Sequence, residues 1–226
     1  MKKKKKKRDS PMRFTRLMLP LAVVAGTSAF ADVYTDATFD QGPDNGNLDL
    51  VSVTVTNDDT NLFFAIETRE IADWTKYLAF IDTGAGGADG NNNAWFRNVE
   101  MGPAGIDFFA GAYIDGGGGI ANHRWNGSSW DGWGGAALSI DWAANTVTMS
   151  FELLDLDISA GDTIGFEIGT SGGNNGDPAT DLMNGNSGTW GGSSSFNEML
   201  SYTVVPAPGA VSLLAVAGLI ARRRRA

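Results

Sequence analysis

The stretch VSVTVTNDDTNLFFAI, residues 51–66, decides the fold class of this chain. Across 51–56, three valines alternate with serine and threonine, which is the period of two of a β-strand with one buried face. The polar segment 57–61 predicts a turn, and the apolar run 62–66 predicts the strand that returns from it. This stretch therefore predicts an antiparallel hairpin.

The rest of the central region repeats this pattern of short strands and polar turns. Glycine accounts for 30 of 226 residues, nearly double the usual share, and strong helix formers are sparse. We expect a second hairpin around Asn126-Gly127, where the turn needs a positive φ, and one helical turn at 153–158. Further strands are expected at 77–81, 95–101, 106–114, 136–140, 146–153, 163–168 and 199–204. This order predicts an all-β fold for residues 32–204, an antiparallel β-sandwich with jelly-roll or immunoglobulin-like layers.

The first 31 residues contain the three parts of a cleavable signal peptide. A lysine-rich start precedes an apolar run at 17–26, and Ala29 and Ala31 supply small residues at the −3 and −1 positions. We expect signal peptidase to cleave after Ala31. Translation from either Met1 or Met12 is compatible with this interpretation.

The end of the chain, residues 205–226, combines a proline motif, an apolar run at 209–221 and a terminal arginine cluster. A stable membrane span needs about 20 apolar residues, and this run is shorter. The segment resembles the PEP-CTERM sorting signal of exopolysaccharide-producing bacteria, although Ala207 stands where that family most often has Glu. The residues that carry the resemblance are Pro206, Ala207, Pro208, Arg222, Arg223, Arg224 and Arg225.

This resemblance implies a substrate of an exosortase-type sorting enzyme that associates transiently with the membrane through its C-terminal segment. The arginines would stay on the cytoplasmic side while the apolar run stalls in the membrane. A permanent tail anchor is the alternative. Either way, we expect an exported protein of the cell envelope, cell surface or extracellular matrix.

The charge of the central region excludes some classes of partner. Residues 32–221 hold four Lys/Arg against 25 Asp/Glu, a net charge of about −21, which repels nucleic-acid phosphates. We therefore expect no nucleic-acid binding. The chain has no cysteine, so it can form neither a disulfide nor a thiolate zinc site. An exported domain of this kind relies on its apolar core or on bound ions such as Ca²⁺.

The central region is similar to carbohydrate-binding family 9 and DOMON-like β-sandwiches, which are found on secreted bacterial proteins. The likeness spans most of 33–204 and is carried by the segments 49–58, 61–64, 74–83 and 159–167. It implies the sandwich fold. Members of that group bind sugars, haem or calcium, or have no known ligand.

A calcium site is one hypothesis for the glycine-rich loop at 82–93. Calcium takes six to eight oxygen ligands, and glycine lets the backbone curl around the ion. A solvated turn explains the same pattern equally well. The same two interpretations, calcium ligand or turn former, apply to Asp40 and Asp44 in a second acidic stretch. We expect no organic cofactor. The candidate calcium ligands are Asp82, Asp89, Asn91 and Asn93.

Seven tryptophans suggest a carbohydrate site, because the apolar face of a sugar stacks on an exposed indole while polar neighbours bind its hydroxyls. Trp74 and Trp142 lie beside patterned strands and are predicted to be core residues, whereas Trp190 lies in a Gly-rich loop. Cross-strand aromatic pairs that only stabilise a hairpin are the alternative. The candidate binding residues are Trp95, Trp125, Trp130, Trp133, Arg124 and Asp131.

Catalytic signals are weak in this sequence. His123 is the single histidine, and the Gly-x-Ser-x-Gly context of a serine nucleophile is absent. We therefore expect a non-enzymatic protein that binds carbohydrate, such as exopolysaccharide, with structural calcium. A structural surface or matrix protein without a small ligand is the second hypothesis, and a secreted glycoside hydrolase is the third.

Overall fold

The computed structural model describes residues 31–206, which contain 14 strands and one short 3₁₀ helix. The signal peptide with Ala29 and the sorting residues from Ala207 onward, including the four arginines, lie outside this range. Within it, no helix is long and apolar enough to cross a membrane.

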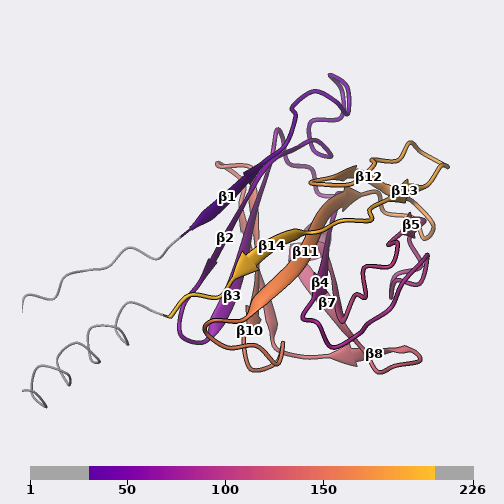
Figure 1. Ribbon diagram of the computed structural model, residues 1–226. Coiled ribbons are helices and arrows are strands. Elements are labelled where there is room, and N and C mark those ends of the chain that lie inside the picture. Colours follow the sequence, from indigo (N-terminus) through magenta and orange to yellow (C-terminus); the bar gives the residue numbers. More distant parts are fainter. Residues whose placement is uncertain (1–30, 207–226) are drawn as a thin grey trace, which may run out of the picture.

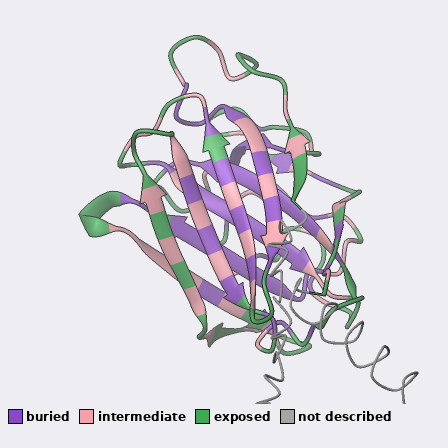
Figure 2. Ribbon diagram, turned by 90° about the vertical axis from the view of Figure 1, so that its left-hand side faces the viewer, coloured by how far each residue is buried: buried purple, intermediate pink, exposed green. Residues whose placement is uncertain are grey.

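One layer is a five-stranded antiparallel sheet, here called sheet A. Its order is β1-β2-β3-β10-β9, and the hairpin predicted from 51–66 is its β2–β3 pair. Figure 2 shows buried and more exposed positions alternating along these strands, as the period-of-two pattern predicts. The strands are β1 (Asp32–Thr35), β2 (Leu50–Asn57), β3 (Asn61–Thr68), β9 (Ala136–Asp141) and β10 (Thr146–Glu152).

The alternation in β2 begins one residue earlier than the sequence suggested. Leu50 is buried and Val51 is not, whereas Val53 and Val55 are fully buried. The pairing of β2 with β3 shifts in register between Leu50 and Ser52. Because such a bulge changes the face of the residues before it, Leu50 takes the core position that Val51 would otherwise occupy.

The second layer, sheet B, packs against sheet A. Its order is β12-β11-β4-β6-β7-β8, and β14 pairs with the first half of β11. The helical segment η1 (Asp115–Gly117) connects β6 to β7. The strands are β4 (Lys76–Asp82), β6 (Phe108–Tyr113), β7 (Gly119–Trp125), β8 (Trp130–Trp133), β11 (Thr163–Ser171), β12 (Ala179–Leu182) and β14 (Leu200–Thr203).

The main core lies between the two sheets. Phe64 of sheet A packs on Phe166 of sheet B with ring centroids 5.2 Å apart, and Tyr34 packs edge-on against Phe166 at 5.0 Å. Both layers are visible in Figure 1. The prediction of an antiparallel β-sandwich is therefore confirmed.

The outer face of sheet B is also buried, because a layer of loops from residues 83–106 and 183–199 covers it. Phe80 packs there against Phe109 and Phe196, each at 5.2 Å. Two short strands, β5 (Val99–Glu100) and β13 (Ser194–Ser195), pair in parallel within this layer. The molecule thus has two apolar clusters, one on each face of sheet B.

The expected strand at 95–101 is reduced to the two residues of β5. Asn93 is the physical reason, since its side chain donates to the carbonyl of Arg97 and accepts from the Arg97 amide, both at 2.8 Å. These bonds fold the backbone into a closed turn that cannot extend into a strand. The strands β1 and β12 were not predicted.

The prediction that Trp74 and Trp142 are core residues is wrong. Their exposed fractions are 43% and 52%. Trp74 lies in the turn before β4, and Trp142 follows the edge strand β9, so neither belongs to the alternating part of a strand. An indole beside a patterned strand is therefore free to remain at the surface.

Residue 111 tests how closely the loop layer packs on sheet B. A Cβ placed on Gly111 would come within 2.2 Å of the Trp95 ring, whereas one placed on Gly132 in β8 would meet nothing within 4 Å. We expect Gly111→Ala to lower the free energy of unfolding by about 1–3 kcal/mol through overpacking. Gly132→Ala is the matched control and should be neutral or slightly stabilising. Urea unfolding measures both, and equal effects would contradict this packing.

Candidate functional site

The β7–β8 hairpin is present as predicted, but it divides the candidate binding residues between the two faces of sheet B. Trp125 and Trp130 are cross-strand partners, with ring centroids 5.4 Å apart, and pack with the outer cluster. Trp133 lies against Phe108 at 5.0 Å on the inner side. The six candidates therefore do not form one site.

The two polar candidates of the hairpin have partners of their own. Arg124 lies over the Phe108 ring at 5.4 Å and forms an ion pair with Asp157. Asp131, opposite Arg124 in register, accepts a hydrogen bond from Asn126 at 3.0 Å. Arg124 and Trp125 still line one end of a hollow of about 430 Å³ beside the 83–86 loop.

Trp125 and Trp130 belong to a packed row of aromatic rings on the outer face. Phe109 connects this row, with centroids 6.4 Å from Trp130 and 5.8 Å from Trp95. The indole N–H of Trp130 donates to the carbonyl of Asn92 at 2.7 Å. These contacts favour a stabilising role for Trp125 and Trp130, while Trp95 stands at the open end of the row.

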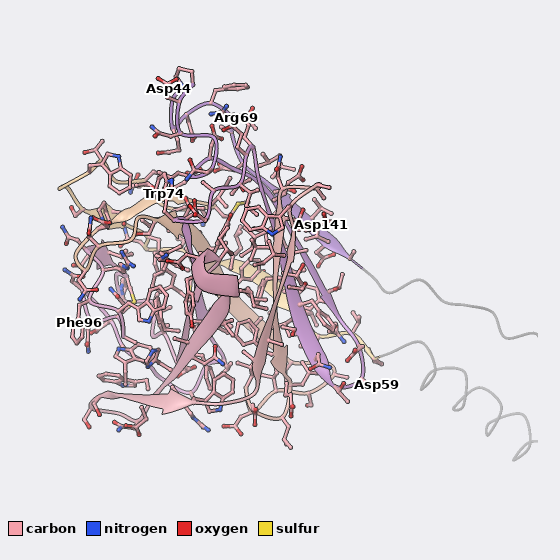
Figure 3. The ribbon with its side chains drawn as sticks, turned by 180° about the vertical axis from the view of Figure 1, so that it is seen from behind. Asp44, Asp59, Arg69, Trp74, Phe96 and Asp141 are labelled. Atoms are coloured by element: carbon pink, nitrogen blue, oxygen red, sulfur yellow. The ribbon has the colours of Figure 1, made fainter. Side chains whose placement is uncertain are left out.

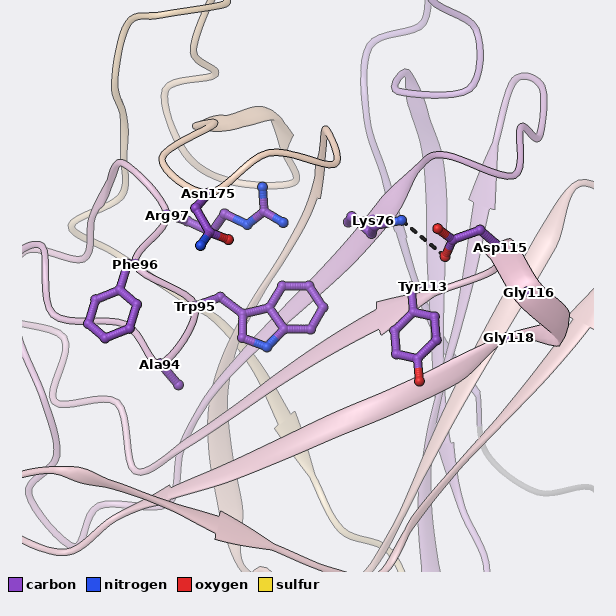
Figure 4. Close-up of a pocket in the computed structure, with 10 residues that line it drawn as sticks. All are labelled: Lys76, Ala94, Trp95, Phe96, Arg97, Tyr113, Asp115, Gly116, Gly118 and Asn175. Atoms are coloured by element: carbon purple, nitrogen blue, oxygen red, sulfur yellow. Dashed lines mark hydrogen bonds and ion pairs between the residues drawn. The ribbon is translucent and has the colours of Figure 1, made fainter.

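Trp95 lines the largest groove described here, with a volume of about 690 Å³. Its ring seats on Gly111, and Figure 4 shows it between Phe96 and Tyr113 at the base of the groove. The residues that line the groove come from β4, β6, η1 and the loops that follow β4 and β11. The other polar lining residues are Lys76, Arg97, Asp115 and Asn175.

Phe96 is held at the rim of this groove in an unusual conformation. Its side chain is 79% exposed, and its φ is +53°. A bulky residue in the left-handed region costs about 1–3 kcal/mol, and exposing a phenyl ring brings no burial energy in return. The rim of the groove therefore carries an exposed aromatic ring in a strained backbone conformation.

Two cations give the groove its polar character. Lys76 Nζ lies 3.1 Å from Asp115 Oδ1, drawn as a dashed line in Figure 4. Arg97 is only 3% exposed; its Nη1 donates to the Gly172 carbonyl at 3.0 Å, and its guanidinium lies 5.4 Å from the Trp95 ring centroid. Burial lowers the pKa of Arg97, and the charge of Asp177 opposes that effect. Arg97 therefore packs against the face of the Trp95 ring.

Sequence reasoning identified Trp95 but missed the rest of the groove. Phe96 could have been found as the aromatic neighbour of Trp95 in a polar loop. Lys76, Tyr113 and Asn175 carry no local signal, because only the strand pairing of β4, β6 and β11 brings their regions together.

Of the four predicted calcium ligands, Asp82 ends β4 and the other three lie in the loop that follows; the described contacts use most of them within the protein. Asp82 Oδ1 accepts from the Gly84 amide at 2.7 Å, and Asn91 donates to Asn98 at 3.1 Å. Asn93 is committed to the turn described above, and Asp89 is exposed.

A different acidic cluster lies at the end of the sandwich, formed by Asp36, Asp40 and Asp181. Among the described residues, it is the one group of three acidic side chains whose possible ligand atoms lie within 4.8 Å of one another. Asp181 is fully buried and accepts from the Leu50 amide at 2.8 Å, which ties β12 to β2. Asp36 Oδ2 is inaccessible and has no hydrogen-bond partner among residues 31–206.

Burial perturbs the acids of this region. Desolvation raises the pKa of Asp36 to about 6 and that of Asp181 to about 7, and the neighbouring negative charges add to both shifts. Burial likewise raises the pKa of Glu167 on β11 to about 8. The folded protein therefore retains protons on these groups at pH values where an unfolded chain has lost them.

Comparisons with known proteins add little. No family model matches the chain, and no curated protein matches it. One solved structure, from work on the pH-induced modulation of Streptococcus parasanguinis adhesion by Fap1 fimbriae, aligns with 79% of this chain and 92% of its own. Its sequence identity is 14% and its TM-score is 0.26. A similarity this weak supports no conclusion about function.

The raised pKa values predict how stability depends on pH. Because the folded state binds more protons than the unfolded chain above about pH 4, the free energy of unfolding should fall as pH rises toward 8 in the presence of EDTA. Asp36→Asn removes one of these acids and should flatten the decline. Thermal melts between pH 4 and 8 measure this decline in stability. Asp59→Asn, an exposed acid outside the cluster, is the control; a decline equally steep in Asp36→Asn and wild type would contradict the prediction.

Proposed function

We propose that this is an exported, surface-sorted, non-enzymatic protein that binds carbohydrate in the groove around Trp95. The observation that carries the proposal is the set of three aromatic residues, Trp95, Phe96 and Tyr113, that line one open groove. Aromatic faces stack on the C–H faces of sugars, and Lys76, Asp115 and Asn175 supply donors and acceptors for hydroxyls.

The position of the groove fits attachment to a surface. In Figure 3, Phe96 lies on the opposite side of the molecule from Asp59. Asp59 and Pro206 line one hollow, so the described chain ends near Asp59. A segment leaving from Pro206 would hold the domain with the groove facing outward. Export and sorting rest on the signal peptide and PEP-CTERM-like motifs and remain proposals.

The lining of the groove favours binding over cleavage. Glycoside hydrolysis usually needs two carboxyl groups on either side of the scissile bond. Among the described residues that line the groove, Asp115 is the one carboxylate, and it is paired with Lys76. This supports a binding protein over the secreted hydrolase.

The binding proposal predicts the effect of removing the central indole. Trp95→Ala removes the stacking surface and should weaken the affinity for a glycan selected on an array by about 30-fold, the equivalent of about 2 kcal/mol. Isothermal titration calorimetry measures this loss. Trp142→Ala is the matched control, because Trp142 is exposed and is not among the residues that line the groove. Unchanged affinity in Trp95→Ala would place the glycan elsewhere.

Structural calcium is part of this proposal, and its position is open between two regions. The acidic cluster offers three carboxylates, of which Asp36 has a buried oxygen without a partner. The predicted loop offers Asp82 and Asp89 together with its backbone carbonyls. A calcium ion in either region would neutralise part of the net negative charge of the domain.

Thermal unfolding locates the proposed ion. Calcium at about 100 times its Kd should add about 2.7 kcal/mol to the free energy of unfolding, and EDTA should reverse the gain. Asp36→Asn should abolish the gain if the acidic cluster binds the ion, whereas Asp89→Asn should abolish it if the loop does. No response of the wild-type protein to calcium or EDTA would contradict a structural ion.

A structural matrix protein is the second candidate, and the outer face of sheet A favours it. Thr54, Ala65, Thr148 and Ser139 lie in one cross-strand row there. Short uncharged side chains in such a row suit packing against a neighbouring chain. A glycan array without any hit would favour this second candidate.

A further inference from the structure

Two exposed tryptophans outside the groove have no structural explanation so far. Trp74 and Trp190 form a tilted pair with ring centroids 6.4 Å apart, and their exposed fractions are 43% and 51%. They come from segments more than 100 residues apart in sequence. Exposing two indoles side by side forgoes burial energy that either would gain in the core.

Described contacts connect this pair to the groove on both sides. A Cβ placed on Gly172 would lie 2.6 Å from the Trp190 ring. The Trp190 ring therefore packs directly on Gly172. The carbonyl of Gly172 accepts from Arg97, whose guanidinium lies over Trp95. On the other side, Trp74 is two residues before Lys76, which lines the groove. The Trp74–Trp190 pair is therefore connected to the groove through the buried Arg97 and through the start of β4.

We propose that the groove and the Trp74–Trp190 pair form one continuous binding surface for an extended, neutral glycan chain of several sugar units. This inference rests on the proposed carbohydrate function and specifies its ligand class. A ligand confined to the Trp95 groove would leave the second pair of indoles unused. A longer chain stacks successive sugars on both aromatic surfaces, and each added stack contributes apolar contact.

Electrostatics selects a neutral chain. The described residues contain four cations, and each of them has an ion-pair partner: Arg69 with Asp49, Lys76 with Asp115, Arg97 with Asp177 and Arg124 with Asp157. An anionic sugar in the groove would therefore compete with a carboxylate that the cation already contacts. It would also approach a domain with a net charge of about −21. Neutral sugars meet neither obstacle.

The test is a chain-length series on the full chain, purified in a detergent without a sugar headgroup. The probes are neutral oligosaccharides of two to six units from the β-1,4-glucan, β-1,3-glucan and mannan series, with oligogalacturonates of equal length as acidic counterparts. By calorimetry, we expect affinity for at least one neutral series to rise at least tenfold from two to six units. Oligogalacturonates should bind at least tenfold more weakly.

Variants separate the two aromatic surfaces. The double substitution Trp74→Ala/Trp190→Ala should remove the gain with chain length and preserve binding of the shortest ligand. Trp95→Ala should weaken the affinity for oligosaccharides of every length. Trp142→Ala should leave these affinities unchanged. Because Trp74 and Trp190 are exposed, the double variant should fold; a thermal melt checks this, and Trp74→Phe/Trp190→Phe should retain most of the gain.

The outcomes are distinguishable. Length-independent binding, or a length dependence unchanged in the double variant, overturns the extended surface while the groove proposal stands. Preferred binding of oligogalacturonate overturns the neutral ligand class. Failure of all oligosaccharides to bind overturns the proposed carbohydrate function itself.

Discussion

The burial of both faces of sheet B is the constraint on which the rest of this structure depends. Residues 77–81 of β4 are fully buried, with Tyr77, Ala79 and Ile81 in one cluster and Leu78 and Phe80 in the other. Sheet A covers only the first of these faces. The second needs its own cover, since exposed apolar faces are unfavourable in water. The loops at 83–106 and 183–199 provide it.

This cover also creates the candidate site. The loop that protects Phe80 carries Trp95 across Gly111 and leaves Phe96 at the rim. Arg97, buried against the Trp95 ring, donates to the carbonyl of Gly172 and so fixes the loop to the end of β11. The proposed binding surface would be pre-organised by such a supported loop, which lowers the entropic cost of binding a flexible chain.

The charge distribution limits what the surface can bind and suggests how stability is regulated. The four described cations are engaged in ion pairs, and the acids around Asp36 and Asp181 hold raised pKa values in a partly dry environment. An acidic medium stabilises this region by protonation, and a divalent cation would stabilise it by neutralisation. The same surplus of acids disfavours anionic glycans.

The sequence by itself determined the β-sandwich, because the alternation of β2 and the apolar run of β3 depend only on neighbours along the chain. It also identified the β7–β8 hairpin from Asn126-Gly127, and Trp95 as a candidate. It could not locate the groove, since Lys76, Trp95, Tyr113 and Asn175 meet only after distant strands pair. For the same reason, the sequence pointed to Asp40 as a possible ligand but not to its neighbours Asp36 and Asp181. Tertiary structure decided which indoles are buried: Trp74 and Trp142 stay at the surface, because an indole's burial depends on what packs over its strand rather than on the strand's own pattern.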